Sequence, residues 1–113
     1  HTQTALRFVV EGEGAFTAVN GERTTMHPGD FIITPGWTWH DHGNPSSGPM
    51  VWLDGLDIPM VQFFDASFAE DSTEDQQKIP RPPGDSFGRY GHNLLPVDGK
   101  RSSKTSPILK SSK

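Results

Sequence analysis

The amino-acid sequence predicts an all-β fold, a sandwich or barrel of about seven short strands. Apolar, β-branched segments recur at spacings of about 8–10 residues, and Gly, Pro and Asn residues separate them. No convincing amphipathic helix interrupts this pattern, which argues against alternating βαβ units. The expected strands are residues 5–10, 15–19, 22–26, 31–34, 37–42, 50–53 and 59–64.

Turn residues delimit the first three strands. The sequence Glu-Gly-Glu-Gly at residues 11–14 separates the apolar segment 5–10 from the alternating segment 15–19. Asn20 and Gly21 both tolerate a positive φ, so they form a two-residue hairpin signal. Residues 22–26 therefore return as an antiparallel partner of residues 15–19.

Proline and glycine delimit the later strands in the same way. Residues 28–30, Pro-Gly-Asp, turn the chain into the strand at residues 31–34, and Pro35 ends that strand. The three remaining segments are short and rich in aromatic and β-branched residues. Residues 68–77 could form one short turn. Residues 79–84 carry three prolines and must form an extended loop.

Hydrophobic residues are concentrated in the first part of the chain. Residues 1–69 hold 28 of the 36 hydrophobic residues, and they carry eight acidic against two basic side chains. Residues 70–113 carry six acidic against eight basic side chains and too few apolar ones for a core of their own. The sequence thus predicts one core-forming domain at residues 1–69 and an irregular, partly disordered extension or linker at residues 70–113.

Composition excludes several classes of protein. The chain has no Cys, which excludes disulfide scaffolds, thiolate zinc sites and a cysteine nucleophile. The acidic first part argues against nucleic-acid binding. No apolar run approaches the roughly 18 residues of a membrane span, and no signal peptide is visible, so we expect a cytoplasmic protein that binds no membrane.

Two histidines lie two residues apart in one expected strand. His40 and His42 fall in the segment 37–42, and a strand places residues of equal parity on one face. Two imidazoles projecting together into a small barrel are a candidate metal or substrate site. Taken alone, the pair is also compatible with polar histidines on an open face.

The residues around His40 sharpen this prediction. Gly29, Pro35, His40 and Asn44 follow the spacing of the second cupin motif, G-x5-P-x-G-x2-H-x3-N, with Trp37 in the place of its inner glycine. The first cupin motif, G-x5-H-x-H-x3,4-E-x6-G, fits upstream when its last glycine is Gly12. His1 then takes the place of its second histidine, and Ala5 takes the place of its glutamate.

These motifs and the surrounding sequence resemble the N-terminal cupin of gentisate 1,2-dioxygenases and of the related salicylate and 1-hydroxy-2-naphthoate dioxygenases. The resemblance is carried by residues 5–23, 26–31, 34–44 and 51–57, and it continues more loosely through residues 87–96 and 105–109. It implies an all-β cupin jelly roll that lacks upstream strands, in a fragment of a longer two-cupin enzyme.

The resemblance implies a non-haem Fe(II) enzyme of extradiol type that uses O₂ to open gentisate, 2,5-dihydroxybenzoate, to maleylpyruvate in aromatic catabolism. It further implies a homo-oligomer, commonly a tetramer. The fragment by itself is expected to have little or no activity, because the first histidine of the ligand motif lies before residue 1.

Residue by residue, the resemblance implies two iron ligands and three substrate contacts. His1 and His40 match iron ligands, and because Ala5 cannot ligate, the site is of the three-histidine type. Arg7 matches an arginine that clamps the substrate carboxylate. His42 matches a histidine that bonds the ring hydroxyl or the oxygen, and Asp54 matches an acidic residue that contacts the substrate or orients His42.

Several alternatives remain open at this point. Arg7 could be a buried arginine paired with Glu11 or Asp54, and the three tryptophans could pack the barrel or an interface. If His1 were a processed N-terminus, its amine and imidazole could chelate copper together with His40. The substrate could be salicylate or 1-hydroxy-2-naphthoate, or the chain could be a non-catalytic cupin that binds a small ligand.

Overall fold

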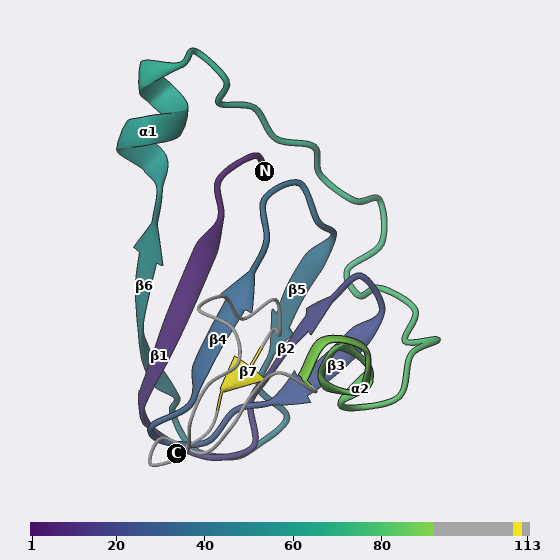
Figure 1. The fold of residues 1–113 in the computed structure, drawn as a ribbon. Helices are drawn as coiled ribbons and strands as arrows, with labels where there is room; N and C mark the ends of the chain where they lie inside the picture. The colour runs from purple at the N-terminus through teal and green to yellow at the C-terminus, as the bar shows by residue number, and fades with distance from the viewer. Residues whose placement is uncertain (92–109, 112–113) are drawn as a thin grey trace.

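The structure, a computed structural model, describes residues 1–91 and 110–111. It contains two antiparallel sheets that face each other (Figure 1). Sheet A has the strand order β6-β1-β4-β7, and sheet B has the order β3-β2-β5. The strands are β1 (Ala5–Glu11), β2 (Phe16–Val19), β3 (Glu22–Thr25), β4 (Phe31–Thr34), β5 (His40–Gly43), β6 (Val51–Leu56) and β7 (Lys110–Ser111). The all-β prediction is confirmed.

The hairpin predicted at Asn20 and Gly21 is present between β2 and β3. Both residues have a positive φ, 46° for Asn20 and 82° for Gly21, as a two-residue turn of this kind requires. The register pairs Val19 with Glu22 directly across the turn. The same β2 pairs on its other side with β5, so the hairpin carries β5 as its third strand.

The core lies between the two sheets. On β1 the alternation places Ala5, Arg7 and Val9 inward and buried. Val9 packs with Ala15, Met26 and Ile32 in a fully buried cluster, and Met50 and Trp52 cover it. This cluster fills one end of the interior, whereas polar side chains occupy the other.

The strand predicted at residues 59–64 is wrong. This segment forms the helix α1 (Ile58–Phe63), in which no residue is buried. Pro59 lies in the first turn, where its missing N–H costs nothing because that group has no partner within the helix. A short apolar run does not by itself distinguish strand from helix, which explains the error.

The extension contains a second short helix, α2 (Asp85–Tyr90), which was not expected from the sequence. Glu22 of β3 anchors it: its two carboxylate oxygens accept hydrogen bonds from the backbone N–H and the hydroxyl of Ser86, at 2.9 and 3.0 Å. Both residues are buried, so the carboxylate charge is held at the start of α2 by these two bonds.

Replacing Glu22 by Ala is therefore expected to destabilise the protein by about 2 kcal/mol, because two charge-assisted hydrogen bonds are lost and Ser86 is left unpaired. Urea unfolding measures this change. Glu11→Ala, on an exposed end of β1, is the matched control and should change stability by less than about 0.5 kcal/mol. Equal stability of Glu22→Ala and the unmodified protein would contradict the anchoring role.

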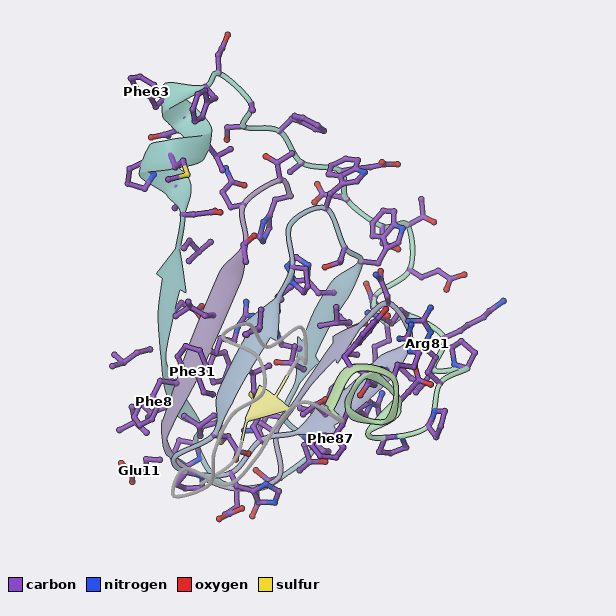
Figure 2. The ribbon with its side chains drawn as sticks, viewed as in Figure 1. Phe8, Glu11, Phe31, Phe63, Arg81 and Phe87 are labelled. Atoms are coloured by element: carbon purple, nitrogen blue, oxygen red, sulfur yellow. The ribbon has the colours of Figure 1, made fainter. Side chains whose placement is uncertain are left out.

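The outer face of sheet A is apolar and exposed. Leu6, Phe8 and Leu53 are exposed there, and Phe8 lies opposite Phe31 in the β1–β4 pairing (Figure 2). Phe63 on α1 is 82% exposed and points away from both sheets. Clusters of exposed apolar side chains of this kind are typical of surfaces that contact another protein. Among the described residues, no helix has the length and apolar character that crossing a membrane requires.

Candidate metal and substrate site

The strand β5 brings His40 and His42 to one face of sheet B, with their ring centroids 5.8 Å apart. The register pairs His40 with Val19 and His42 with Thr17 on β2. Asp41, between them, points the other way and accepts a hydrogen bond from the backbone N–H of Gln77. The sequence-based placement of the two imidazoles on a common face therefore agrees with the structure.

His1 meets His40 although 39 positions separate them in the sequence. Their ring centroids are 4.6 Å apart and the rings are nearly perpendicular. The backbone N–H of Trp37 donates to the carbonyl of His1 at 2.8 Å, which fixes the first residues beside the turn that leads into β5. The two predicted metal ligands are thus brought together from separate segments.

Both of these rings are oriented by backbone carbonyls. Nδ1 of His1 lies 2.9 Å from the carbonyl oxygen of Gln3, and Nδ1 of His40 lies 2.9 Å from that of Thr38. A carbonyl oxygen only accepts a hydrogen bond, so Nδ1 carries the proton in each ring and Nε2 keeps its lone pair. This is the arrangement by which proteins prepare histidines to bind a metal ion.

The two imidazoles consequently fit a ligand pair for Fe(II). Imidazole nitrogen suits Fe among other transition metals, and the short distance between the rings allows them to share one ion. Within the part of the chain that the structure describes, no third His, Cys, Asp or Glu joins them in a group that could hold a metal. The described residues therefore offer two candidate ligands.

Arg7 projects from β1 into the interior, where only 5% of it is exposed. Its NH1 donates to the hydroxyl of Thr34 at 2.8 Å, and its Nε lies 3.1 Å from Oδ1 of Asp54, an ion pair without the alignment of a hydrogen bond. Asp54 stands directly opposite Arg7 in the β1–β6 pairing. Burial lowers the pKa of Arg7 and the charge of Asp54 opposes this, so the guanidinium stays charged.

The ion pair confirms that Arg7 is a buried arginine paired with Asp54. This pairing still allows Arg7 to bind the carboxylate of a substrate. Asp54 is 40% exposed at its side chain and engages only one edge of the guanidinium. The remaining donors of Arg7 are available to a planar carboxylate, for which the guanidinium fork is well suited.

His42 lies on β5, in the sheet that faces the strand of Arg7; its side chain is exposed, and it is electrostatically coupled to Arg7. Burial lowers the pKa of His42 to about 4, with further lowering by the charges of Arg7 and His40, while Asp54 and Asp41 act in the opposite direction. The imidazole is therefore neutral at pH 7. Its Nδ1 lies 3.0 Å from the hydroxyl of Thr17.

Trp37 shapes the entrance beside His1. It has a φ of +54°, a left-handed conformation that bulky residues rarely adopt, and it occupies the motif position where glycine is expected. Its ring packs on Phe68 with the centroids 4.8 Å apart. Together with Trp39, it lines a small cavity of about 80 Å³ next to His1. Trp37 and Phe68 are both exposed, so packing of this tryptophan in the barrel or at an interface stays a prediction.

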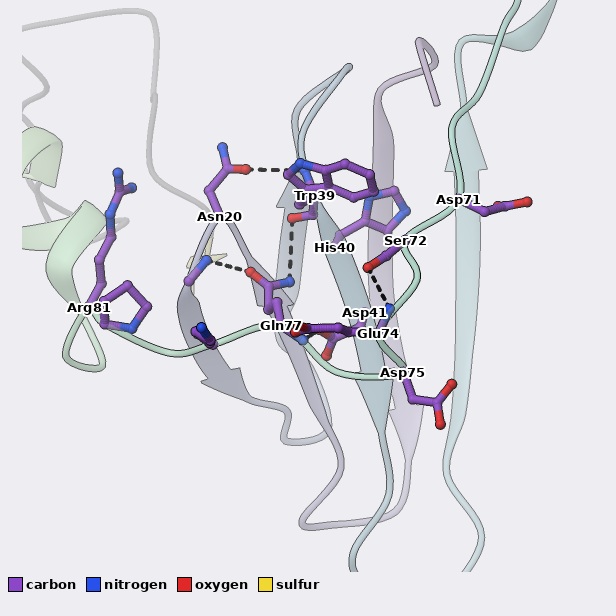
Figure 3. A pocket seen from close by; sticks show the side chains of 13 residues that line it. Asn20, Trp39, His40, Asp41, Asp71, Ser72, Glu74, Asp75, Gln77 and Arg81 are labelled. Atoms are coloured by element: carbon purple, nitrogen blue, oxygen red, sulfur yellow. Dashed lines mark hydrogen bonds between the residues drawn. The ribbon is translucent and has the colours of Figure 1, made fainter.

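A larger hollow of about 760 Å³ lies between β5 and the segment that follows residue 70 (Figure 3). His40 and Trp39 form one side of it, and Asp71, Glu74 and Asp75 lie along the opposite side. Gln77 closes its base, since its side-chain amide accepts a hydrogen bond from the N–H of Gly21 and donates to the carbonyl of Ala18. The hollow is open and acidic, which does not suit a carboxylate substrate.

The sequence analysis did not identify Thr17, Thr34 or Trp52 as part of the site. Thr17 and Thr34 are both buried and bond to site residues. The ring of Trp52 lies 6.1 Å from that of His42. A threonine at the inward position of an apolar strand was a usable signal, because a buried hydroxyl needs a partner. Which side chain it contacts depends on the strand register.

Comparison with known proteins agrees with this geometry. The sequence model of the cupin domain family matches residues 1–57. The chain belongs to the cupin family. Its two facing antiparallel sheets are the cupin jelly roll expected from the sequence, and the fold prediction is confirmed.

Among curated proteins, this cupin is 64% identical over 109 residues to gentisate 1,2 dioxygenase 1 of Aquipseudomonas alcaligenes, covering 96% of the chain and 31% of that protein. It is 44% identical over 98 residues to a 1-hydroxy-2-naphthoate 1,2-dioxygenase of Nocardioides sp. (strain KP7), covering 86% of the chain and 25% of that protein. The chain thus spans about a third or less of the length of these relatives.

Among solved structures, the cupin resembles the salicylate 1,2-dioxygenase of Pseudaminobacter salicylatoxidans with a TM-score of 0.74 and 40% identity, covering 97% of the chain and 32% of that structure. The gentisate adduct of that enzyme aligns with a TM-score of 0.68 and 39% identity, covering 97% of the chain and 31% of that structure. The resemblance to ring-cleaving dioxygenases is therefore confirmed in both sequence and fold.

Proposed function

We propose that this chain is the iron-binding cupin of a dioxygenase that opens the ring of gentisate to give maleylpyruvate. The single observation that carries the proposal is the meeting of His1 and His40, each with its Nε2 lone pair free, opposite a buried arginine. The 64% identity to a gentisate 1,2-dioxygenase supports gentisate as the substrate. Because the relatives are about three times longer, the activity is assigned to the whole protein that contains this chain.

Fe(II) held at His1 and His40 would supply a redox-active Lewis acid at which an electron-rich ring and O₂ react. The chain's own residues would prepare the substrate for this chemistry. Arg7 would hold the carboxylate by a bidentate, charge-assisted contact. His42, neutral and coupled to Arg7, would hydrogen-bond the ring hydroxyl or the oxygen, and Asp54, paired with Arg7, would contact the substrate or orient His42.

The direct test is oxygen uptake by the Fe(II)-loaded, full-length protein with three substrates. We expect the highest kcat/KM with gentisate, and lower values with salicylate and with 1-hydroxy-2-naphthoate. Removing iron with a chelator should abolish uptake, and adding Fe(II) back should restore it. Turnover that persists after complete iron removal would overturn the proposal.

Salicylate and 1-hydroxy-2-naphthoate remain the alternative substrates, since relatives named for both are similar to this chain. A higher kcat/KM with either would reassign the substrate but leave the site unchanged. A non-catalytic cupin that binds a small ligand is the other alternative. It would bind gentisate without consuming oxygen, whether or not iron is present.

A homotetramer in the cytoplasm, with a domain boundary near residue 69, also stays a prediction. The exposed apolar face of sheet A, which includes Leu6, Phe8 and Leu53, supports assembly with another protein surface.

A further inference from the structure

The hydroxyl of Thr17 is placed to control the proton on His42. The two residues are direct partners in the β2–β5 pairing, so their side chains project to the same face. Thr17 is 1% exposed, and its Oγ1 lies 3.0 Å from Nδ1 of His42 and 3.5 Å from Sδ of Met26, which is also fully buried. The hydroxyl therefore contacts two possible acceptors but can donate a hydrogen bond to only one of them.

His42 differs in this respect from the other two histidines of the site. His1 and His40 each bond through Nδ1 to a backbone carbonyl, which can only accept, so the proton of those rings must be on Nδ1. A hydroxyl can donate or accept. The tautomer of His42 therefore depends on where the proton of Thr17 points, and hence on Met26.

The hydrogen bonds favour one of the two arrangements. If Thr17 donates to the sulfur of Met26, its oxygen accepts from Nδ1–H of His42 and both contacts are hydrogen bonds. If it donates to Nδ1 instead, the sulfur contact is lost and the ring proton moves to Nε2. Nε2 of His42 has no protein partner in the described part of the chain, and the residue is exposed, so Nε2 can meet solvent in either arrangement and the sulfur contact decides between them.

We propose that Thr17 is a positioning residue that keeps the ring proton of His42 on Nδ1, so that Nε2, the nitrogen that does not contact Thr17, is left as a hydrogen-bond acceptor. This inference deepens the proposed function and rests on it for its consequence in catalysis. An acceptor nitrogen coupled to Arg7 would favour a substrate that carries a hydroxyl on the ring next to the carboxylate held by Arg7. A side chain that could only donate a hydrogen bond would not have this preference for a ring hydroxyl.

The tautomer can be observed without iron or substrate, by the ¹⁵N chemical shifts of the imidazole of His42 in labelled, metal-free protein at pH 7. The unmodified protein should show the proton on Nδ1. Thr17→Ser keeps the hydroxyl and should give the same spectrum. Thr17→Val removes the hydroxyl and should produce a mixture containing the Nε2–H form. A proton on Nε2 in the unmodified protein would overturn the inference, as would an unchanged tautomer in Thr17→Val.

The kinetic consequence is measured in the iron-loaded, full-length protein. Thr17→Val should lower kcat for gentisate by about 10- to 100-fold, the usual effect of removing an outer partner of a site histidine, and Thr17→Ser should restore most of it. A purely structural role would instead lower the melting temperature and leave kcat per folded molecule unchanged. If Thr17→Val does not fold, the spectra of the unmodified protein and of Thr17→Ser still decide.

The two proposals can fail separately. If the unmodified protein has the expected tautomer but no oxygen uptake with any of the three acids, the proposed function is wrong and the assignment of Thr17 as positioning residue stands. If the protein is active with gentisate but the ring proton of His42 is on Nε2, the proposed function stands and the inference about Thr17 is wrong.

Discussion

Replacing His40 by Ala is expected to reduce Fe(II) affinity by more than the roughly 10- to 100-fold that changes to outer partners of a ligand cost, because a coordinate bond itself is removed. His1→Ala should have a comparable effect, because both rings bond through Nδ1 to a backbone carbonyl and offer Nε2 to the metal, and the two rings lie next to each other. Equilibrium dialysis against Fe(II) without oxygen measures the affinity, and oxygen uptake with gentisate should fall to the level of the chelated protein.

His27→Ala is the matched control for these two variants. His27 lies in the loop before β4 with its side chain half exposed, and it contacts the acidic residues Glu13 and Asp30 at distances of 3.8 and 3.4 Å. It should keep both iron and activity. Iron binding by His40→Ala that equals that of the unmodified protein would show that the assignment of the metal ligands is wrong.

Replacing Arg7 by Ala is expected to weaken gentisate binding by about 2 kcal/mol or more, which corresponds to roughly a 30-fold rise in the dissociation constant. The physical reason is the loss of the positively charged fork that faces the substrate carboxylate. Arg7→Lys keeps the charge but not the fork, so it should recover only part of the affinity. Binding is measured by calorimetry with the iron-loaded protein under anaerobic conditions.

The ion pair with Asp54 requires a control of its own. Arg7→Ala also leaves Thr34 without its partner and Asp54 without its counter-charge, so part of the loss could come from the fold. Asp54→Asn removes the counter-charge but keeps Arg7 and its bond to Thr34. It should change gentisate affinity by less than Arg7→Ala does. If both variants bind gentisate as tightly as the unmodified protein, Arg7 has a structural role only.

The placement of His40 and His42 could be predicted because it depends on strand spacing, whereas the meeting of His1 with His40 could be predicted only from the resemblance to the family. The period of a strand places His40 and His42 on one face, and the family motif brings His1 to the same point. The contact of Arg7 with Asp54 was one of two alternatives, and it required the β1–β6 register to decide it. No local pattern specifies which residues of distant strands stand opposite one another.

Two further features could not be predicted, the first for a local reason and the second because it depends on contacts between strands. The helix α1 is a single short element in which no residue is buried, so neither its period nor its burial distinguishes it from a strand. The role of Thr17 depends on two contacts, to His42 and to Met26, that come from different neighbouring segments. The pattern of a single strand indicates that the hydroxyl of Thr17 is buried, but it does not indicate which residues the hydroxyl contacts.

The left-handed backbone conformation of Trp37 sets stability against the shape of the site at this position. Holding a bulky residue at that φ costs about 1–3 kcal/mol, and a glycine at the same position would adopt it freely. Trp37→Gly would thus raise the thermal stability of the chain but remove the aromatic ring that lines the small cavity next to His1.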